Sequence, residues 1–373
     1  MLSLRALNRA MLERQLPLRR RRMPALAAVE HLVGLQAQLP NPPYIGLWTR
    51  LEGFAVGELS QLVHDRKVVR AVLLRATQHL TAAPDFLSLR PLLQPVLDRG
   101  RQAAMGRLTA GMDLAELAAT GRELLRGRTL TRPQLRALLA ERWPDRDPDA
   151  LAWSVQYLVP LVHVPPGITW RTGGVVRSAL AEDWLGRPPP GAPSTDGLIR
   201  RYLAAFGPAT VADVQTRSGL RRLDVALARL RPELRVFHDE AGRELFDLPD
   251  APRPDQRTPV PPRFLPEFDN LLVAHADRGR IMTDEHRRRV ITGSLVRATV
   301  LVDGFVRGTW TIKRERGAAT LTVELFAPLP ADDQATVAEE GARLLAFTSP
   351  DADVHQIRFT PAGAPGTHRT SLR

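Results

Sequence analysis

Apolar residues recur at helical spacing in successive groups along the chain, and each group is followed by short runs rich in β-branched residues. This succession of amphipathic helices and a hairpin occurs three times and is typical of winged helix-turn-helix units. In the first group the pattern predicts helices at residues 3–16, 24–35 and 56–65 and strands at 68–74 and 78–82. A helical stretch at 84–126 then leads to the second group.

The second group begins at a helix start signal, in which Thr131 and Gln134 form a capping box with Pro133 in the first turn. A helix at 147–161 follows, and strands at 162–164 and 170–172 are expected to form a wing. After a proline-rich spacer at 188–191, the third group predicts helices at 196–206, 211–218 and 222–230. Thr210 caps the middle helix, and 234–247 forms a hairpin.

The pattern changes after six prolines between Pro249 and Pro262, which indicate a stiff connector. Strand-like runs follow at 290–291, 298–302, 305–313 and 319–325, with turns at 303–304 and 316–317. A helix at 332–345 and a strand at 355–360 complete a small β-rich domain, expected to be an open or closed barrel.

These patterns predict an α+β protein in which three tandem winged helix-turn-helix units precede a small β-barrel-like domain. We expect boundaries at 1–126 for the first unit with its bridging helices, 127–190 for the second, 191–250 for the third and 263–373 for the β-rich domain.

Composition narrows the class of protein. No apolar run approaches the roughly 20 residues needed to cross a bilayer, and the first residues lack the features of a secretory signal. The absence of cysteine excludes thiolate metal sites and catalytic thiols and agrees with a cytoplasmic location. A net charge of +12, carried almost wholly by arginine, favours a nucleic-acid partner.

The candidate chemistry lies at Gln36 and Gln38. Residues two apart share a face only on extended backbone, and Pro40 disfavours helical geometry at Leu39. The two amides could therefore converge on one point. From spacing alone, the alternative that they are polar residues at a helix end, bonded to free carbonyls, carries more weight.

Four segments of the chain, the first of which contains the two glutamines, support a functional interpretation of these residues. They are GLQAQ at 34–38, LRATQHLTA at 74–82, FLPEFDNLLVAHADR at 264–278, and VLVDGFV at 300–306 with Thr309 and Trp310. Together these segments resemble the AlkZ/YcaQ-type winged-helix DNA glycosylases over almost the whole chain.

The resemblance implies three winged helices and a β-barrel around a concave DNA channel, and excision of bulky N-alkylated purines such as N7-alkylguanine and N3-alkyladenine. It also implies unhooking of interstrand crosslinks by some members. The family's motif places catalytic roles on Gln36 and Gln38, and a glutamine at the second position resembles the AlkZ-like branch, which is associated with self-resistance to DNA-alkylating antibiotics.

The chemistry of an amide agrees with such a reaction. Glutamine does not titrate near neutral pH and cannot act as a general base, but its carbonyl dipole can position water and stabilise a developing sugar cation. A lyase step would need an amine, and the only lysines are Lys67 and Lys313. We expect a monofunctional enzyme without a cofactor.

Further residues are candidates for DNA contact. They are Arg75, Thr77 and His79, which alternate on a strand-like run, Asp303 and Gly304 at a hairpin tip, and Arg287 and Arg288. For His79 a structural role is equally open, and for the hairpin tip a simple turn is the safer interpretation. The basic runs at 19–22 and 287–289 could be solvated faces or phosphate contacts.

A polar cluster, comprising Asp269, Asn270, His275, Asp277 and Arg278, lacks the spacing of metal ligands. We interpret it as hydrogen-bonded scaffolding and expect no metal.

The expected partner is double-stranded DNA with alkylated purines or crosslinks, bound by a monomer in the cytoplasm, in association with the nucleoid. The alternative is a non-catalytic winged-helix transcriptional regulator, which the fold and charge would equally support. Regulators usually pair on palindromic sites, whereas this chain carries three units in one polypeptide.

Overall fold

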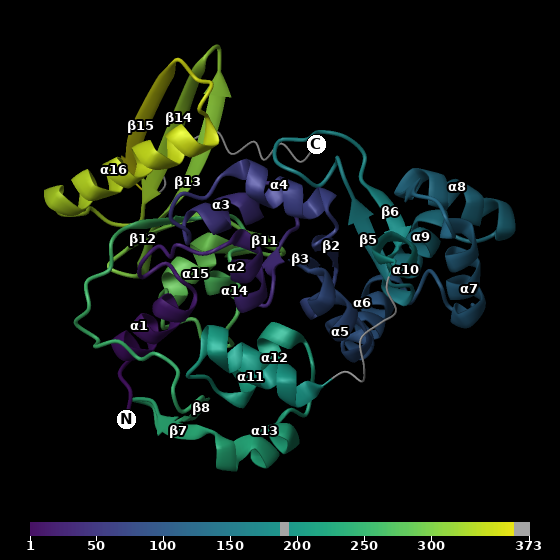
Figure 1. Ribbon diagram of the computed structural model, residues 1–373, viewed down its shortest axis with the longest axis horizontal. Helices are drawn as coiled ribbons and strands as arrows, with labels where there is room; N and C mark the ends of the chain where they lie inside the picture. Colours follow the sequence, from purple (N-terminus) through teal and green to yellow (C-terminus); the bar gives the residue numbers. More distant parts are fainter. Residues whose placement is uncertain (187–193, 362–373) are drawn as a thin grey trace.

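The structure is a computed structural model that describes residues 1–186 and 194–361. The chain forms a mixed α+β fold (Figure 1). The helices are α1 (Leu4–Arg14), α2 (Ala25–His31), α3 (Pro42–Trp48), α4 (Val56–His64), α5 (Ala83–Leu92), α6 (Gln94–Met105), α7 (Leu114–Leu125), α8 (Arg132–Arg142), α9 (Pro148–Leu158), α10 (Ala181–Leu185), α11 (Thr195–Phe206), α12 (Val211–Ser218), α13 (Asp224–Leu230), α14 (Asn270–Val273), α15 (Asp284–Val290) and α16 (Ala331–Thr348). The strands are β1 (Leu35–Gln36), β2 (Val68–Val72), β3 (Gln78–Ala82), β4 (Leu130–Thr131), β5 (Leu161–Val164), β6 (Arg177–Leu180), β7 (Arg235–His238), β8 (Glu244–Asp247), β9 (Arg263–Leu265), β10 (Ile291–Thr292), β11 (Leu295–Val296), β12 (Thr299–Val302), β13 (Phe305–Glu315), β14 (Ala318–Leu325) and β15 (Val354–Pro361).

The helix start signals read from the sequence are confirmed. Thr131 and Thr210 each accept a backbone N–H with the side chain and form capping boxes at α8 and α12. The helix expected at 24–35 ends early, at His31, because Val33 and Gly34 have positive φ angles and turn the chain into β1. The predicted spacer at 188–191 lies outside the described residues.

Helix α3 was not predicted. The proline cluster after Gln38 indicated a break in helical structure, and the break is present, but a new helix begins directly at Pro42. Proline is tolerated in a first helical turn because the missing N–H has no intrahelical acceptor there.

One six-stranded sheet joins the first two predicted hairpins, with the strand order β1-β3-β2-β5-β6-β4. The link is the antiparallel contact of β2 with β5, where Arg70 and His163 are register partners. The strand expected at 170–172 was wrong, because the partner of β5 is β6, at Arg177–Leu180. The intervening loop is long enough to reach the first unit, where the Arg171 N–H donates to Asn41 Oδ1 at 2.8 Å.

The C-terminal strands form an open sheet with the order β15-β14-β13-β12-β9, and α16 lies across one face of it (Figure 1). No pairing joins β15 to β9 in the described part of the chain, so the barrel-like expectation is corrected to an open sheet. The turns at 303–304 and 316–317 are confirmed, with positive φ at both residues of each turn, as tight hairpins require.

Hydrophobic packing crosses the expected boundaries between units. Tyr44 and Leu47 of α3 share a core with Val300, Leu321 and Leu344 of the C-terminal part. A second core surrounds α11–α13 together with α5, and a third lies among α7, α8 and α9. In Figure 1 the α7–α9 group forms a lobe at the right, beside the main body.

None of the helices in 1–186 and 194–361 has an apolar stretch long enough to cross a bilayer.

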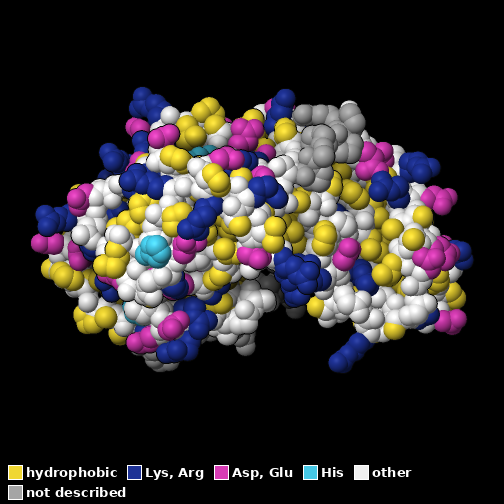
Figure 2. All heavy atoms as spheres, turned by 90° about the horizontal axis from the view of Figure 1, so that it is seen from below, with side chains coloured by type: hydrophobic (Ala, Val, Ile, Leu, Met, Phe, Trp, Pro, Cys, Tyr) yellow, Lys and Arg dark blue, Asp and Glu magenta, His cyan; other side chains and the backbone are white. Residues whose placement is uncertain are grey.

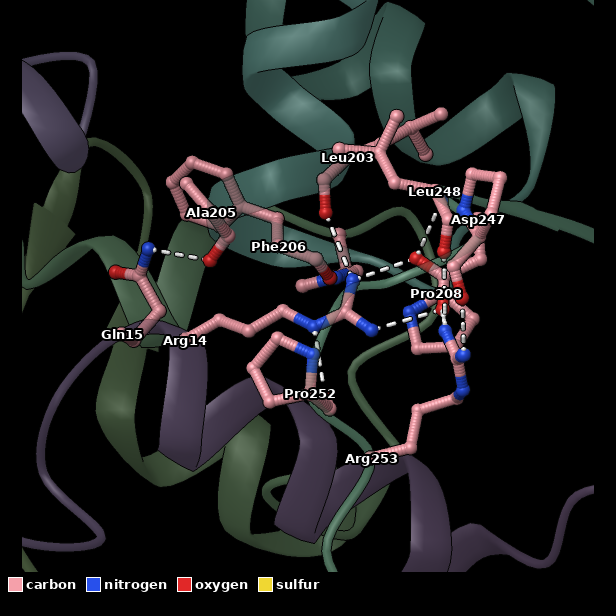
Figure 3. A network of polar contacts seen from close by, with 12 residues as sticks. Arg14, Gln15, Leu203, Ala205, Phe206, Pro208, Asp247, Leu248, Pro252 and Arg253 are labelled. Atoms are coloured by element: carbon pink, nitrogen blue, oxygen red, sulfur yellow. Dashed lines mark hydrogen bonds and ion pairs between the residues drawn. The ribbon is translucent and has the colours of Figure 1, made fainter. Parts of the chain in front are cut away.

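Buried arginines connect distant segments of the main body. Figure 3 shows Arg14 of α1 bonded to both carboxylate oxygens of Asp247 and to the Leu203 carbonyl, at 2.6–2.8 Å. Arg50, which follows α3, binds both carboxylate oxygens of Asp269 at 2.8 Å, and both side chains are at most 1% exposed. Such a pair contributes little net stability, but the removal of one partner leaves a buried charge.

We therefore expect Arg50→Met to lower the free energy of unfolding by about 3–5 kcal/mol, measured by urea denaturation. The matched control is Arg136→Met, which removes an ion pair whose side chains are 48% and 52% exposed and should change stability by less than about 1 kcal/mol. Equal, small effects of the two substitutions would contradict a structural role for the Arg50–Asp269 pair.

Candidate active site

The two glutamines lie at the end of a short strand, β1, and in the bend that follows it. Gln36 lies on β1, opposite His79 of β3, and the Ala37 N–H donates to the Gln78 carbonyl at 2.8 Å. The strand ends at Gln36 and Gln38 lies in a bend, but the contacts of the two amides with Arg75 and Gln78 bring both side chains beside the 75–78 segment. Gln36 is 8% exposed, whereas Gln38 is exposed. One amide is therefore buried at the base of the site and the other faces solvent.

Both amides are held through their oxygen atoms. The guanidinium of Arg75 donates to Gln36 Oε1, and the Gln78 backbone N–H donates to Gln38 Oε1 at 2.9 Å. An amide oxygen has two lone pairs, so each can accept one more hydrogen bond. Each amide is oriented and still able to bind a water molecule or a sugar hydroxyl.

Arg75 reaches Gln36 from a turn. The prediction that residues 75–79 form a strand was wrong for the first of these residues, because Leu74–Ala76 form a 3-10 turn and β3 begins at Gln78. Arg75 and Ala76 both have positive φ, at 53° and 57°. Gly219 packs on this turn, since a Cβ there would lie 3.3 Å from Arg75 Cα. Non-glycine residues with positive φ are uncommon, which indicates that the surroundings fix this conformation.

His79 is fully buried beneath the motif strand, and its Nδ1 lies 3.0 Å from the Thr77 carbonyl. Burial lowers the pKa of His79 well below its usual range, and the nearby charges of Arg217 and Arg75 lower it further. The imidazole is neutral at physiological pH. Thr77 itself bonds to the Leu74 carbonyl and closes the turn.

The site gathers guanidinium groups without carboxylate partners in the described residues. Arg217 of α12 is 2% exposed and donates to the Gly34 carbonyl at 3.3 Å. Burial lowers the pKa of Arg75 to about 10, and the charge of Arg278 adds to this effect. The pKa of Arg278 is in turn lowered by burial and by Arg287. Arg75, Arg278 and Arg287 are therefore close enough for the charge of one to affect the pKa of the next.

Three residues at the site were missed by sequence reasoning or were given no role there. Arg70 donates to the carbonyls of Ala37 and Gln38, and Arg217 binds Gly34. Asn270, from the cluster interpreted as scaffolding, donates to the same Gly34 carbonyl at 2.9 Å. The periodicity of apolar residues does not indicate which side chains bind the backbone of a distant segment. The one available signal is the arginine in β2, since arginine is unusual in an apolar strand.

The predicted DNA contacts at the hairpin tip, Asp303 and Gly304, pack against α1. Asp303 is bonded to Arg5 and Arg9 of α1, and the Gly304 carbonyl accepts from Asn8 at 2.8 Å. A Cβ on Gly304 would lie 2.6 Å from α1 side-chain atoms. This packing favours a simple turn over a DNA contact.

The two basic runs differ in their contacts. Arg287 pairs with Asp284 within α15 and Arg288 is exposed, so this run remains open to a phosphate partner. All four arginines of the run at 19–22 form ion pairs with glutamates, but Arg19 and Arg21 share Glu13, so their charge is only partly offset.

The cluster at 269–278 is used for hydrogen bonds and ion pairs. Asp269 binds Arg50, and Asp277 binds Arg243 at 2.6 Å. His275 Nε2 lies 3.1 Å from the Phe206 carbonyl. These contacts fit the scaffolding interpretation, and within the described ranges no three acidic or histidine side chains are grouped as metal ligands.

The surface between the lobes is hollowed. Figure 2 shows a notch in the outline between the main body and the lobe that holds α7–α9, with Lys and Arg side chains beside it. Over the rest of this face, basic side chains alternate with acidic and apolar ones. The basic side chains in this view are therefore interspersed with others and do not form one continuous patch.

Comparisons with known proteins agree with this site. A family model described as DNA glycosylase AlkZ-like matches residues 29–347, which include both glutamines. Among solved structures, the DNA glycosylase AlkZ of Streptomyces sahachiroi is similar with a TM-score of 0.77 and 22% identity, over 96% of this chain and 100% of that chain. That likeness shows a shared fold. No curated protein matches this chain.

The buried histidines predict how stability changes with pH. Burial lowers the pKa of His79, and it lowers the pKa of His163 to about 3, whereas an unfolded histidine titrates near 6.5. Between these values the unfolded state binds more protons, so the free energy of unfolding falls as pH falls below about 6.5. Each histidine contributes about 1.4 kcal/mol per pH unit.

We expect this loss in urea denaturation series between about pH 6.5 and 5, above the range in which most carboxylates titrate. His163→Asn removes one titrating group and should reduce the slope by about 1.4 kcal/mol per pH unit. A free energy of unfolding that stays constant over this range would show that the folded protein protonates these rings as readily as the unfolded chain.

Proposed function

The chain belongs to the AlkZ-like DNA glycosylase family, and from that premise we propose that it hydrolyses the N-glycosidic bond of bulky N-alkylated purines in double-stranded DNA. The observation that supports this proposal is that Arg75 and the Gln78 N–H orient the amides of Gln36 and Gln38, next to the pairing of β1 with β3. The family match also favours a glycosylase over a transcriptional regulator.

The substrate class follows from what amides can do. An N7-alkylguanine or N3-alkyladenine carries a positive charge and leaves readily, so the transition state is a sugar cation that needs little acid catalysis. Amide oxygens directed at that cation, and at the attacking water, act as preorganised dipoles without a proton transfer to glutamine. Unmodified bases are poor leaving groups and are spared.

The half-buried and exposed arginines near α15 suit the DNA backbone better than the sugar. A guanidinium close to the sugar cation would oppose its formation, whereas one at a flanking phosphate stabilises the bound strand. We propose that Arg278, Arg287 and Arg288 follow the phosphates away from Gln36. Arg75 and His79 then stabilise the motif itself.

We propose that the units act as three tandem winged helices around a concave channel. The pairs β2/β3, β5/β6 and β7/β8 each follow a group of helices, as wings do. The notch in Figure 2 is a candidate part of that channel. A monomer in the cytoplasm, associated with the nucleoid, suffices for this reaction.

The reaction ends at an abasic site. A lyase step needs an amine at the sugar, and neither lysine is placed in the site: Lys67 is exposed at the start of β2, and Lys313 pairs with Glu315 at 2.8 Å. Crosslinks joined through alkylated purines present the same bond, so we extend the proposal to their unhooking and to self-resistance of a producer of DNA-alkylating compounds.

We expect Gln36→Ala and Gln38→Ala each to lower the single-turnover rate of base release from N7-alkylguanine DNA by about 10²–10³-fold, as the loss of one preorganised dipole does elsewhere. Affinity for the same duplex should change little. The matched control is Gln61→Ala on the surface of α4, whose amide bonds to Asp65, with an expected rate equal to that of the unsubstituted protein.

The reaction product distinguishes a monofunctional glycosylase from a glycosylase with lyase activity and from a transcriptional regulator. Release of intact base, with an abasic site and no adduct trapped by borohydride, supports a monofunctional enzyme. A trapped protein–DNA adduct would refute that part. Sequence-specific binding to undamaged DNA without base release would overturn the glycosylase proposal in favour of a regulator.

A further inference from the structure

One buried arginine holds the backbone of the Gln36–Gln38 segment. Arg70 lies on β2 and is 6% exposed. Its Nε donates to the Ala37 carbonyl at 2.7 Å, and its Nη2 donates to the Gln38 carbonyl at 3.0 Å. Two N–H groups of one rigid planar fork therefore fix two successive peptide groups.

Arg70 acts from the face opposite to the reacting groups. Gln36 is the register partner of His79, and His79 is the partner of Ala71, so these three side chains share one face of the sheet. Arg70 precedes Ala71 and leaves β2 on the other face. It contacts the motif only through backbone carbonyls.

The remaining N–H groups of Arg70 connect it to the second hairpin. Arg70 Nη1 lies 2.9 Å from Nδ1 of His163, its register partner on β5. Because a guanidinium can only donate, the ring accepts at Nδ1 and carries its proton on Nε2. Gln156 Nε2 on α9 lies 3.2 Å from that Nε2. Because the ring nitrogen donates, Gln156 accepts this proton with its amide oxygen, which takes the place of Nε2 after a rotation of the amide group by about 180°.

The charge states of His163 and Arg70 agree with a hydrogen bond from the guanidinium to the imidazole. Burial and the adjacent Arg70 lower the pKa of His163 to about 3, so the ring stays neutral and able to accept. Burial alone lowers the pKa of Arg70 to about 10, which leaves it charged at neutral pH. No carboxylate among the described residues pairs with Arg70, so its orientation depends on these hydrogen bonds.

We propose that Arg70, His163 and Gln156 are positioning residues for base excision, and that through them the second hairpin and α9 set the backbone from which Gln38 projects. The proposal rests on the proposed function of Gln36 and Gln38. Its physical basis is that a displacement of about 1 Å of a reacting group costs on the order of 10²-fold in rate. Loss of the acceptor at His163 frees the guanidinium, and the Ala37 and Gln38 carbonyls lose their fixed partner.

The test compares two substitutions of His163. His163→Asn keeps an oxygen near the position of Nδ1, whereas His163→Leu keeps the volume and removes the acceptor. We expect His163→Leu to lower the single-turnover rate of base release by about 10–100-fold with affinity for the N7-alkylguanine duplex unchanged, and His163→Asn to stay within a few-fold of the unsubstituted rate. The matched control is Ser178→Ala, at the register partner of His163 on β6.

A second measurement does not depend on activity. Hydrogen–deuterium exchange of residues 36–39 should be faster in His163→Leu than in the unsubstituted protein and unchanged in His163→Asn and Ser178→Ala. Arg70→Lys, which keeps the charge and loses the fork, should reproduce His163→Leu in both measurements and replaces it if that variant does not fold.

The outcomes separate the two proposals. If the unsubstituted protein releases no alkylated base, the proposed function fails, and the exchange data still decide whether the chain of hydrogen bonds sets the motif. If His163→Leu and Arg70→Lys fold and keep both the rate and the exchange of the unsubstituted protein, the positioning role is overturned. Equal losses in rate and in DNA affinity would also overturn it, because they indicate a general structural defect.

Discussion

The antiparallel pairing of Gln36 with His79 is the interaction on which the arrangement of the site depends. It makes a short segment extended between a helix that ends at His31 and one that begins at Pro42. The strand ends at Gln36 and a bend follows at Gln38, and the contacts of both amides bring them beside residues 75–78. The same pairing brings β3 and the Leu74–Ala76 turn beside the motif, so that Arg75 can orient Gln36 and the Gln78 N–H can orient Gln38. A helical segment would separate these two amides.

The arginine-rich composition has two uses in this fold. Arg14, Arg50 and Arg70 are buried and bind backbone carbonyls of distant segments, with a carboxylate partner for the first two. Arginine is suited to this structural role because it stays charged when buried and its planar guanidinium can donate to several acceptors at once. Part of the charge that suggested a DNA partner is therefore structural. The groups left for phosphate are those near α15 and at the surface.

Local signals in the sequence were sufficient for much of the fold. The capping box at Thr131, the N-cap at Thr210 and the turn at 316–317 are decided by neighbours in the chain, and they were predicted correctly. Non-local pairing was not accessible in this way. Nothing near 163 in the sequence indicates that β5 joins β2, or that the strand after β5 begins only at Arg177. For the same reason the glutamines could be named from the motif, whereas Arg70 and Arg217, which hold the motif backbone, could not.

The central claim is that Gln36 and Gln38 together face the sugar whose bond is broken. A crystal structure with a DNA duplex that carries a cationic pyrrolidine in place of one deoxyribose, a mimic of the sugar cation, tests it most directly. The account predicts the pyrrolidine nitrogen within hydrogen-bond distance of an amide oxygen of Gln36 or Gln38, or of a water held between them, with the Gln36–His79 pairing intact. A pyrrolidine bound elsewhere on the protein, with both amides free of contact, would contradict it.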